Sequence, residues 1–250
     1  MLRRTLSASL AALGILLAAQ VHAGISLSST RIIFNSADKE AGVTVRNTGE
    51  KVLIQSWLDS GDAADDNPPF AVTPPLARIP ANEQQLLRIL YEGRGLPDDR
   101  ESVVWLNVQE IPQAIEGENI LQLAVRQRIK VFFRPSALAA EAQRAPEKLR
   151  WTLEPRNGNA LLRVKNPSPY YVSMADVRLN GGGKKIVASD STMVGPGEEK
   201  EFPIAQALPS GGLVLSFSSI NDYGAQVPFT ANLTAGNAAA AMAKRAAHDG

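Results

Sequence analysis

The sequence predicts an all-β protein made of two immunoglobulin-like β-sandwich domains. Short segments in which apolar residues alternate with polar residues, or run apolar, recur along the chain, as expected for strands. Turn signals rich in glycine, proline, asparagine and aspartate separate these segments. The sequence shows no alternation of strands with helices, which is the pattern that would predict a parallel sheet. The 250 residues allow two domains of about 110 residues each once a leader is set aside.

Residues 1–23 have the pattern of a secretory signal peptide. A basic start, Met1-Leu-Arg-Arg4, precedes an apolar stretch at 5–19, and Val21-His-Ala23 forms an A-x-A-like cleavage site. The apolar stretch falls short of the ~20 residues that a membrane span needs, so a membrane anchor is the less favoured alternative. We therefore expect export and a mature chain that begins at Gly24. Because the chain has no cysteine, hydrophobic cores rather than disulfides must stabilise it.

The first domain is expected to span 24–138. Its clearest strand candidates are separated by turn signals such as Asn47-Thr-Gly49 and Asp59-Ser-Gly61. The candidates are 29–34, 41–46, 52–57, 85–90 and 102–108. A longer strand within 119–135 completes the domain.

The β pattern stops after Pro135, and 136–145 is predicted to be a linker with a helical turn. The second domain is expected to span 146–234, with turns at positions such as Gly195-Pro-Gly197. Its strand candidates are 149–153, 160–165, 170–179, 185–188, 201–204, 213–218 and 227–232. The alanine-rich tail, 235–250, is expected to be disordered or weakly helical.

The segment 119–135 is the most informative part of the sequence. Its odd positions from 121 to 133 are apolar apart from Gln127, whereas its even positions are mostly polar and cationic. A strand of this length would extend for about 45 Å, at least twice the usual length, so part of it is expected to overhang its sheet. An apolar overhanging edge favours aggregation unless it pairs with another chain. Gln127 is interpreted as the point where the overhang ends.

Catalysis is strongly disfavoured. The only histidines are His22, in the leader, and His248, near the C-terminus, so the body of the chain has no imidazole base or histidine metal ligand. Paired acids such as Asp98-Asp99 lie in polar turns, where solvated carboxylates are ordinary. Gly181-Gly-Gly-Lys-Lys185 lacks the spacing of a phosphate-binding loop. We expect no enzyme activity, cofactor, metal or small-molecule substrate, and the net charge of +1 gives no reason to expect a nucleic-acid partner.

Several motifs, in one order along the chain, resemble the PapD-like periplasmic pilus chaperones of the chaperone–usher pathway. The motifs are Ser29-Thr-Arg-Ile-Ile-Phe-Asn35, Gln55-Ser-Trp57, Phe70-Ala-Val-Thr-Pro-Pro-Leu-Ala-Arg78, Asp99-Arg-Glu-Ser102, Trp105-Leu-Asn-Val108, Ile111-Pro112, Gln127-Arg-Ile-Lys-Val-Phe-Phe-Arg-Pro135, Asn166-Pro-Ser-Pro-Tyr-Tyr-Val172 and Asn221-Asp-Tyr-Gly-Ala225. The resemblance implies a boomerang of two sandwiches with a cationic cleft between them, located in the periplasm.

The resemblance also implies a mechanism. A pilus subunit lacks its last strand, and the chaperone lends its long strand to fill the open groove, which is donor-strand complementation. Leu121, Leu123 and Val125 match the lent residues, although periodicity alone fits core residues of the first domain equally well. Arg31 and Lys130 match the pair that binds the C-terminal carboxylate of the subunit, where strand periodicity alone would predict solvated cations.

Glu101, Arg134 and Asp222 match an interdomain ion-pair network, and the alternative is three unconnected surface charges. The implied partners are pilus subunits and the outer-membrane usher, and the free chaperone is expected to be able to self-associate. A secreted two-domain immunoglobulin-like adhesin or ligand-binding module is the alternative function. It would share the fold and the export signal but would not need Arg31, Lys130 and the long strand together.

Overall fold

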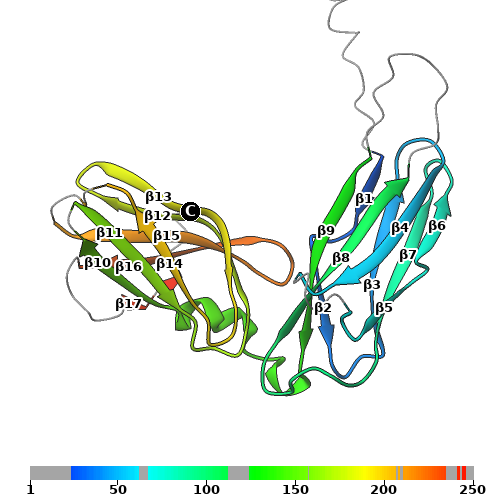
Figure 1. Cartoon of the computed structure of the whole chain (residues 1–250), viewed down its shortest axis with the longest axis horizontal. Coiled ribbons are helices and arrows are strands. Elements are labelled where there is room, and N and C mark those ends of the chain that lie inside the picture. Colours follow the sequence, from blue (N-terminus) through cyan, green and yellow to red (C-terminus); the bar gives the residue numbers. More distant parts are fainter. Residues whose placement is uncertain are drawn as a thin grey trace, which may run out of the picture.

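The computed structural model describes residues 24–61, 67–111, 124–156, 158–206, 208, 211–234, 241–242 and 244–245. Two β-sandwich lobes meet at an angle, and the short helical segments that follow the first lobe lie near their junction (Figure 1). The all-β, two-sandwich prediction is confirmed. In this part of the chain, no helix has the length and apolar character needed to cross a membrane.

The first domain contains a four-stranded sheet, ordered β1-β3-β7-β5, and a five-stranded sheet, ordered β2-β9-β8-β4-β6. The strands are β1 (Ile25–Leu27), β2 (Arg31–Asn35), β3 (Glu40–Asn47), β4 (Val52–Asp59), β5 (Phe70–Thr73), β6 (Leu76–Ile79), β7 (Gln84–Tyr91), β8 (Ser102–Ile111) and β9 (Arg126–Arg134). Pairing in both sheets is antiparallel except between β2 and β9, which run parallel.

The five shorter strands predicted for this domain are present, but β1, β5 and β6 lie outside the predicted set. Strand β1 has three residues, too few for a periodic pattern. Strands β5 and β6 have four residues each and flank Pro74-Pro75, which has the appearance of a turn signal in the sequence.

An aromatic cluster attaches β9 to both sheets of the first domain. The Phe133 ring centroid lies 4.5 Å from that of Tyr91 and 5.7 Å from that of Phe34. Phe70 of β5 completes the cluster. Because aromatic side chains bury large apolar areas, this cluster fixes the C-terminal half of β9 in the core.

The second domain also has two sheets, ordered β14-β11-β10-β17 and β13-β12-β15-β16-β18. The strands are β10 (Arg150–Arg156), β11 (Asn159–Lys165), β12 (Val172–Gly181), β13 (Lys184–Val194), β14 (Glu199–Ile204), β15 (Leu213–Ile220), β16 (Gln226–Leu233), β17 (Ala241–Met242) and β18 (Lys244–Arg245). The predicted strands of this domain are all present. Trp151 and Phe229 lie on different sheets, and the ring of Phe217 packs against both in the core.

The tail differs from the prediction of a disordered or weakly helical segment at the four residues that the structure describes. There β17 pairs with β10, and β18 pairs with β16. Backbone pairing with two strands that would otherwise be the outer strands of their sheets accounts for the extended conformation.

The predicted linker forms two 3₁₀ segments, η1 (Ser136–Leu138) and η2 (Ala142–Lys148). Contacts hold it at the domain junction. The backbone N–H of Ser136 donates to Ser36 Oγ at 2.8 Å, and Tyr170 Oη of the second domain donates to the carbonyl of Leu138 at 2.7 Å. Ala145 and Pro146 are buried, so this linker is packed rather than freely extended.

Candidate functional site

Strand β9 has two chemically different faces, as the alternation predicts. Val131 and Phe133 point into the core of the first domain, whereas Lys130 and Arg134 contact residues of the second domain. Burial rises along the strand, from the exposed Arg126 to four buried residues at its C-terminal end. The N-terminal part of the strand is therefore accessible and the C-terminal part is packed.

The edge of β9 is open over its accessible half. Strand β2 pairs with β9 only from Lys130 to Arg134, whereas β8 pairs on the other side from Arg126 to Phe133. Among the described strands, residues 126–129 therefore have a neighbour on one side only. Such an edge presents unpaired backbone N–H and C=O groups to another extended segment.

The predicted long strand is described only in part. Leu121 and Leu123 lie outside the described residues. Val125 is 48% exposed, and its carbonyl accepts a hydrogen bond from the backbone N–H of Glu110 at 2.9 Å. The structure thus places Val125 outside the hydrophobic core. Gln127 is half-buried and donates from Nε2 to the carbonyl of Ile25 at 2.7 Å, which secures the start of β9 to β1.

Arg31 and Lys130 are direct partners in the parallel register of β2 and β9. Both reach the second domain. Arg31 Nη1 donates to the carbonyl of Ile220 at 2.8 Å, and Lys130 Nζ donates to Ser173 Oγ at 3.3 Å. Neither cation forms an ion pair with a carboxylate of the described residues. The structure therefore brings the two predicted cations together at the junction of the domains.

The electrostatics of this pair favour an anion. Burial, together with repulsion from Arg31 and Lys200, lowers the pKa of Lys130 to about 8. Burial also lowers the pKa of Arg31, and attraction to Asp222 opposes that effect. Arg31 Nε is buried and has no hydrogen-bond partner. A carboxylate at this position would compensate both charges and could accept hydrogen bonds from two cationic donors.

Aromatic rings lie beside the two cations. The guanidinium of Arg31 lies 5.7 Å from the ring centroid of Phe132, and Lys130 Nζ lies 5.4 Å from that of Trp105. Cation–π contacts of this kind stabilise each charge and restrict its movement. The cations are held by contacts at the junction without having their charge neutralised.

Phe132 is a residue of the domain junction that the sequence pattern did not single out. It stands on the otherwise cationic face of β9 yet is 3% exposed. Its ring centroid lies 5.9 Å from that of Tyr171 in the second domain, so it belongs to the contact between the domains. The sequence did contain a signal for this contact, because Phe132 is an apolar residue at an even position between the cations Lys130 and Arg134.

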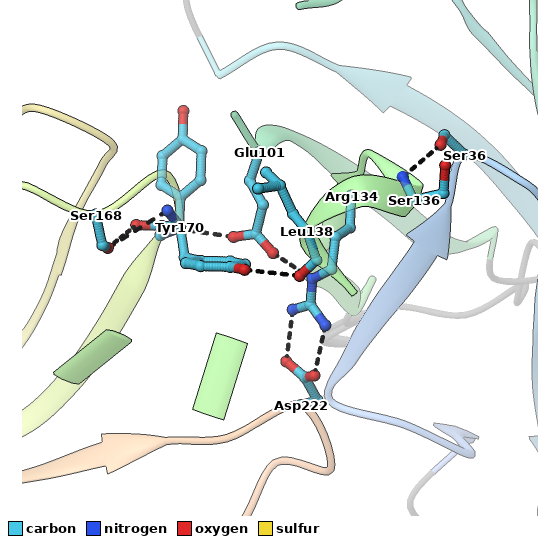
Figure 2. A network of polar contacts seen from close by, with 9 residues as sticks. Ser36, Glu101, Arg134, Ser136, Leu138, Ser168, Tyr170 and Asp222 are labelled. Carbon is cyan, nitrogen blue, oxygen red and sulfur yellow. Dashed lines mark hydrogen bonds and ion pairs between the residues drawn. The ribbon is translucent and has the colours of Figure 1, made fainter. Parts of the chain in front are cut away.

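Glu101, Arg134 and Asp222 form a connected network across the domain junction (Figure 2). Arg134 Nε donates to Glu101 Oε1 at 2.6 Å, and its Nη1 and Nη2 donate to the two oxygens of Asp222 at 2.8 and 2.9 Å. The backbone N–H of Tyr171 donates to Glu101 Oε2 at 2.8 Å. The planar guanidinium thus joins one carboxylate of each domain.

The network is largely shielded from solvent. Glu101 is 3% exposed and Arg134 is 6% exposed. Burial alone would lower the pKa of Arg134, but the hydrogen bonds to Asp222 and Glu101 more than offset it, so this pKa is raised. Burial raises the pKa of Glu101, and attraction to Arg134 opposes the increase.

The hairpin between β15 and β16 carries the contacts of the second domain. Asn221 Oδ1 accepts hydrogen bonds from the backbone N–H groups of Tyr223 and Ala225 at 3.0 and 2.9 Å, which shapes the turn. Gly224 has a positive φ of 82°. A Cβ there would lie 2.4 Å from Thr30 Oγ1, so glycine permits the close approach of the two domains. The described residues contain no cluster of histidine, cysteine or acidic side chains suited to a metal ion.

Two protein-family models match the chain. The model described as "Pili and flagellar-assembly chaperone, PapD N-terminal domain" matches residues 24–139, and "Pili assembly chaperone PapD, C-terminal domain" matches residues 144–231. Among curated proteins, the chain is 37% identical over 226 residues to the probable fimbrial chaperone YadV of Escherichia coli K12, covering 84% of this chain and 90% of that protein. It is 34% identical to the chaperone protein FimB/FhaD of Bordetella pertussis, covering 86% and 90%.

Solved structures agree with this similarity. The YadV chaperone matches with a TM-score of 0.72 and 38% identity, covering 84% of this chain and 99% of that one. The Pseudomonas aeruginosa CupB2 chaperone matches with a TM-score of 0.67 and 35% identity, covering 82% and 98%. A Salmonella enterica structure of the SafA pilin in complex with the SafB chaperone matches with a TM-score of 0.67 and 31% identity, covering 83% and 95%.

Proposed function

Because this chain belongs to the PapD-like family of pilus-assembly chaperones, we propose that Arg31 and Lys130 bind the C-terminal carboxylate of a pilus subunit. The protein is a periplasmic-type pilus chaperone: it binds subunits by donor-strand complementation, prevents their aggregation and delivers them to an outer-membrane usher. The family assignment replaces the alternative of a secreted adhesin or ligand-binding module.

The observation that carries the proposal is the uncompensated cation pair. Arg31 and Lys130 are adjacent in register, partly desolvated, and without a carboxylate partner among the described residues. A free backbone carboxylate at the end of a strand has the size and charge to join both donors. Truncating one partner of such a buried contact costs on the order of 2–5 kcal/mol.

Leu121, Leu123 and Val125 are proposed to be the side chains lent to the groove of the subunit. Support comes from the part of the strand that the structure describes, because Val125 is about half exposed and β9 has an open edge from 126 to 129. Backbone pairing along that edge would supply affinity, while alternate side chains would select the subunit and its register.

The Glu101–Arg134–Asp222 network is proposed to hold the angle between the domains. The two cations contact the second domain through Ile220 and Ser173, so a change in the angle would alter their position. A rigid junction keeps the donors in place before the subunit arrives, which lowers the entropic cost of binding.

The remaining proposals concern the limits and chemistry of the chain. Residues 1–23 are proposed to be a cleaved signal peptide that exports the protein to the periplasm. The domains are proposed to span 24–138 and 146–234. No catalytic role is proposed, because the family is one of chaperones and strand exchange needs no reaction at the protein.

Single substitutions test the carboxylate site. Arg31→Ala and Lys130→Ala are each expected to weaken capture of a denatured subunit by at least about 30-fold, which corresponds to about 2 kcal/mol. Arg88→Ala is the matched control, because Arg88 is an exposed cation on the other sheet of the same domain. Capture is measured as the yield of complex after dilution of the subunit from denaturant, over a range of chaperone concentrations. Equal capture by all variants would refute the proposed site.

A further inference from the structure

The tail of this chain adds a strand to each sheet of the second domain. Ala241 and Met242 pair with Trp151 and Arg150 on β10, and Lys244 and Arg245 pair with Thr230 and Phe229 on β16. In the strand order of each sheet, the tail strand is the outermost and covers β10 or β16. One residue separates the two tail strands in the sequence, and each strand pairs with a different sheet.

The tail lies where the two sheets enclose the aromatic core. Trp151 and Phe229 are 0% and 2% exposed. The ring of Phe217 joins them, with centroids 5.5 Å from Trp151 and 5.4 Å from Phe229. The tail pairs with the backbone of both outer residues, so it closes the seam between the sheets at this position.

The end of the tail also reaches the junction between the domains. Arg245 lines a cavity of about 90 Å³ together with Arg31 and Phe132 of the first domain, Glu147 of η2 and Asp222 of the β15–β16 hairpin. The covered edges are thus close to the residues that hold the domain angle.

We propose that the tail strands β17 and β18 are an intramolecular plug for a strand-accepting surface formed by the edges of β10 and β16. Open edges pair readily with other chains, and β9 of the first domain has an open edge from 126 to 129. Without the tail, the edges of β10 and β16 would be further places where an extended segment could pair. The chain's own tail is the occupant, because it is covalently attached and so present at a high effective concentration.

Hydrogen exchange tests the plug directly. In the full chain, the amides of residues 150–151 and 229–230 that point at the tail are expected to exchange slowly, because they are freed only when the tail detaches. In a variant that ends at Thr234, those amides should exchange at least about tenfold faster. A variant that ends at Arg245 is the matched control and should keep the protection. Equal exchange in all three proteins would overturn the proposal.

A substitution in the full chain covers the case in which the truncated chain is unstable. Lys244→Pro in the full chain removes one backbone donor from β18, and it should speed hydrogen exchange on β16. Ala247→Pro, beyond the paired residues, should not speed that exchange.

Light scattering reports the consequence of losing the tail for association between molecules. The chain ending at Thr234 is expected to dimerise with rising concentration through the uncovered edges, while the chain ending at Arg245 is expected to behave as the full chain does. Identical association of both truncated chains would contradict the role of the tail as a plug.

Discussion

Replacement of Asp222 by alanine should loosen the angle between the domains without unfolding either domain. Asp222 accepts two charge-assisted hydrogen bonds from Arg134, at 2.8 and 2.9 Å. Its side chain is 30% exposed, whereas that of Arg134 is 7% exposed. Loss of one partner of a largely buried charged contact costs about 2–5 kcal/mol. For the equilibrium between docked and undocked domains, this cost lowers the equilibrium constant for docking by a factor of about 30 to a few thousand.

Each domain should keep its own stability, because Asp222 lies at a hairpin tip whose turn is formed by the Asn221 side chain. Tyr223→Ala is the matched control, since Tyr223 is the next residue and is 85% exposed. Arg134→Ala should loosen the angle as well. It should also lower the melting temperature of the first domain, because it removes the counter-ion of Glu101, which is 3% exposed.

Distances between spin labels measure the angle. The chain has no cysteine, so Lys39→Cys and Lys184→Cys give one labelling site in each domain, both at exposed positions. The labelled parent and the Tyr223→Ala control should show a narrow distance distribution, and Asp222→Ala should show a broad one. A distribution unchanged by Asp222→Ala would refute the network as the element that holds the angle, and would leave the linker and the Phe132–Tyr171 contact to do so.

The site leads to four further predictions. Subunit capture should weaken as pH rises through about 8, because Lys130 loses its proton there; a pH series of capture yields checks this, and Lys130→Arg should remove the decline. The pKa of Lys130 is about 8 in the folded protein, against the ordinary value of 10.5. The charged side chain therefore destabilises the fold by its full amount below pH 8. The free energy of unfolding should rise as pH increases from about 8 towards 10.5, because the unfolded chain binds the proton more tightly over this range. Leu123→Glu and Val125→Glu should each abolish subunit capture. The melting temperature should stay within about 2 °C of that of the parent, since Val125 is exposed and such surface changes cost little. A large fall in melting temperature would assign these side chains to the chaperone's own core. Phe132→Ala should cost about 3–5 kcal/mol in thermal or denaturant unfolding and should broaden the same spin-label distances, because Phe132 is 3% exposed and contacts the second domain.

The sequence predicts local structure well where a strand has two different faces. The alternation in 126–134 correctly separates Val131 and Phe133, which are buried in the core, from Lys130, which faces the second domain. Periodicity cannot identify the partner of Lys130, because Arg31 is distant in sequence and meets it only through the parallel pairing of β2 with β9. The resemblance to a family supplied that pair and the Glu101–Arg134–Asp222 trio.

The contributions of the second domain were harder to predict. Ser173 and Tyr171 contact Lys130 and Glu101 only because of the way the domains dock, and no local pattern encodes that docking. The tail strands were missed for a related reason. Alanine-rich sequence carries no strand signal, and residues 241–242 and 244–245 are extended because two sheet edges are available for pairing.

The central claim is that Arg31 and Lys130 recognise the C-terminal carboxylate of the subunit, and a double-mutant cycle tests it most directly. Apparent dissociation constants would be measured for the parent chain and Arg31→Ala, each with a subunit that ends in a carboxylate and with the same subunit ending in an amide. The account predicts a coupling free energy of about 2–5 kcal/mol between Arg31 and the carboxylate, so that Arg31→Ala has little further effect on the amidated subunit. A coupling near zero, with the amidated subunit captured as tightly as the normal one, would contradict it.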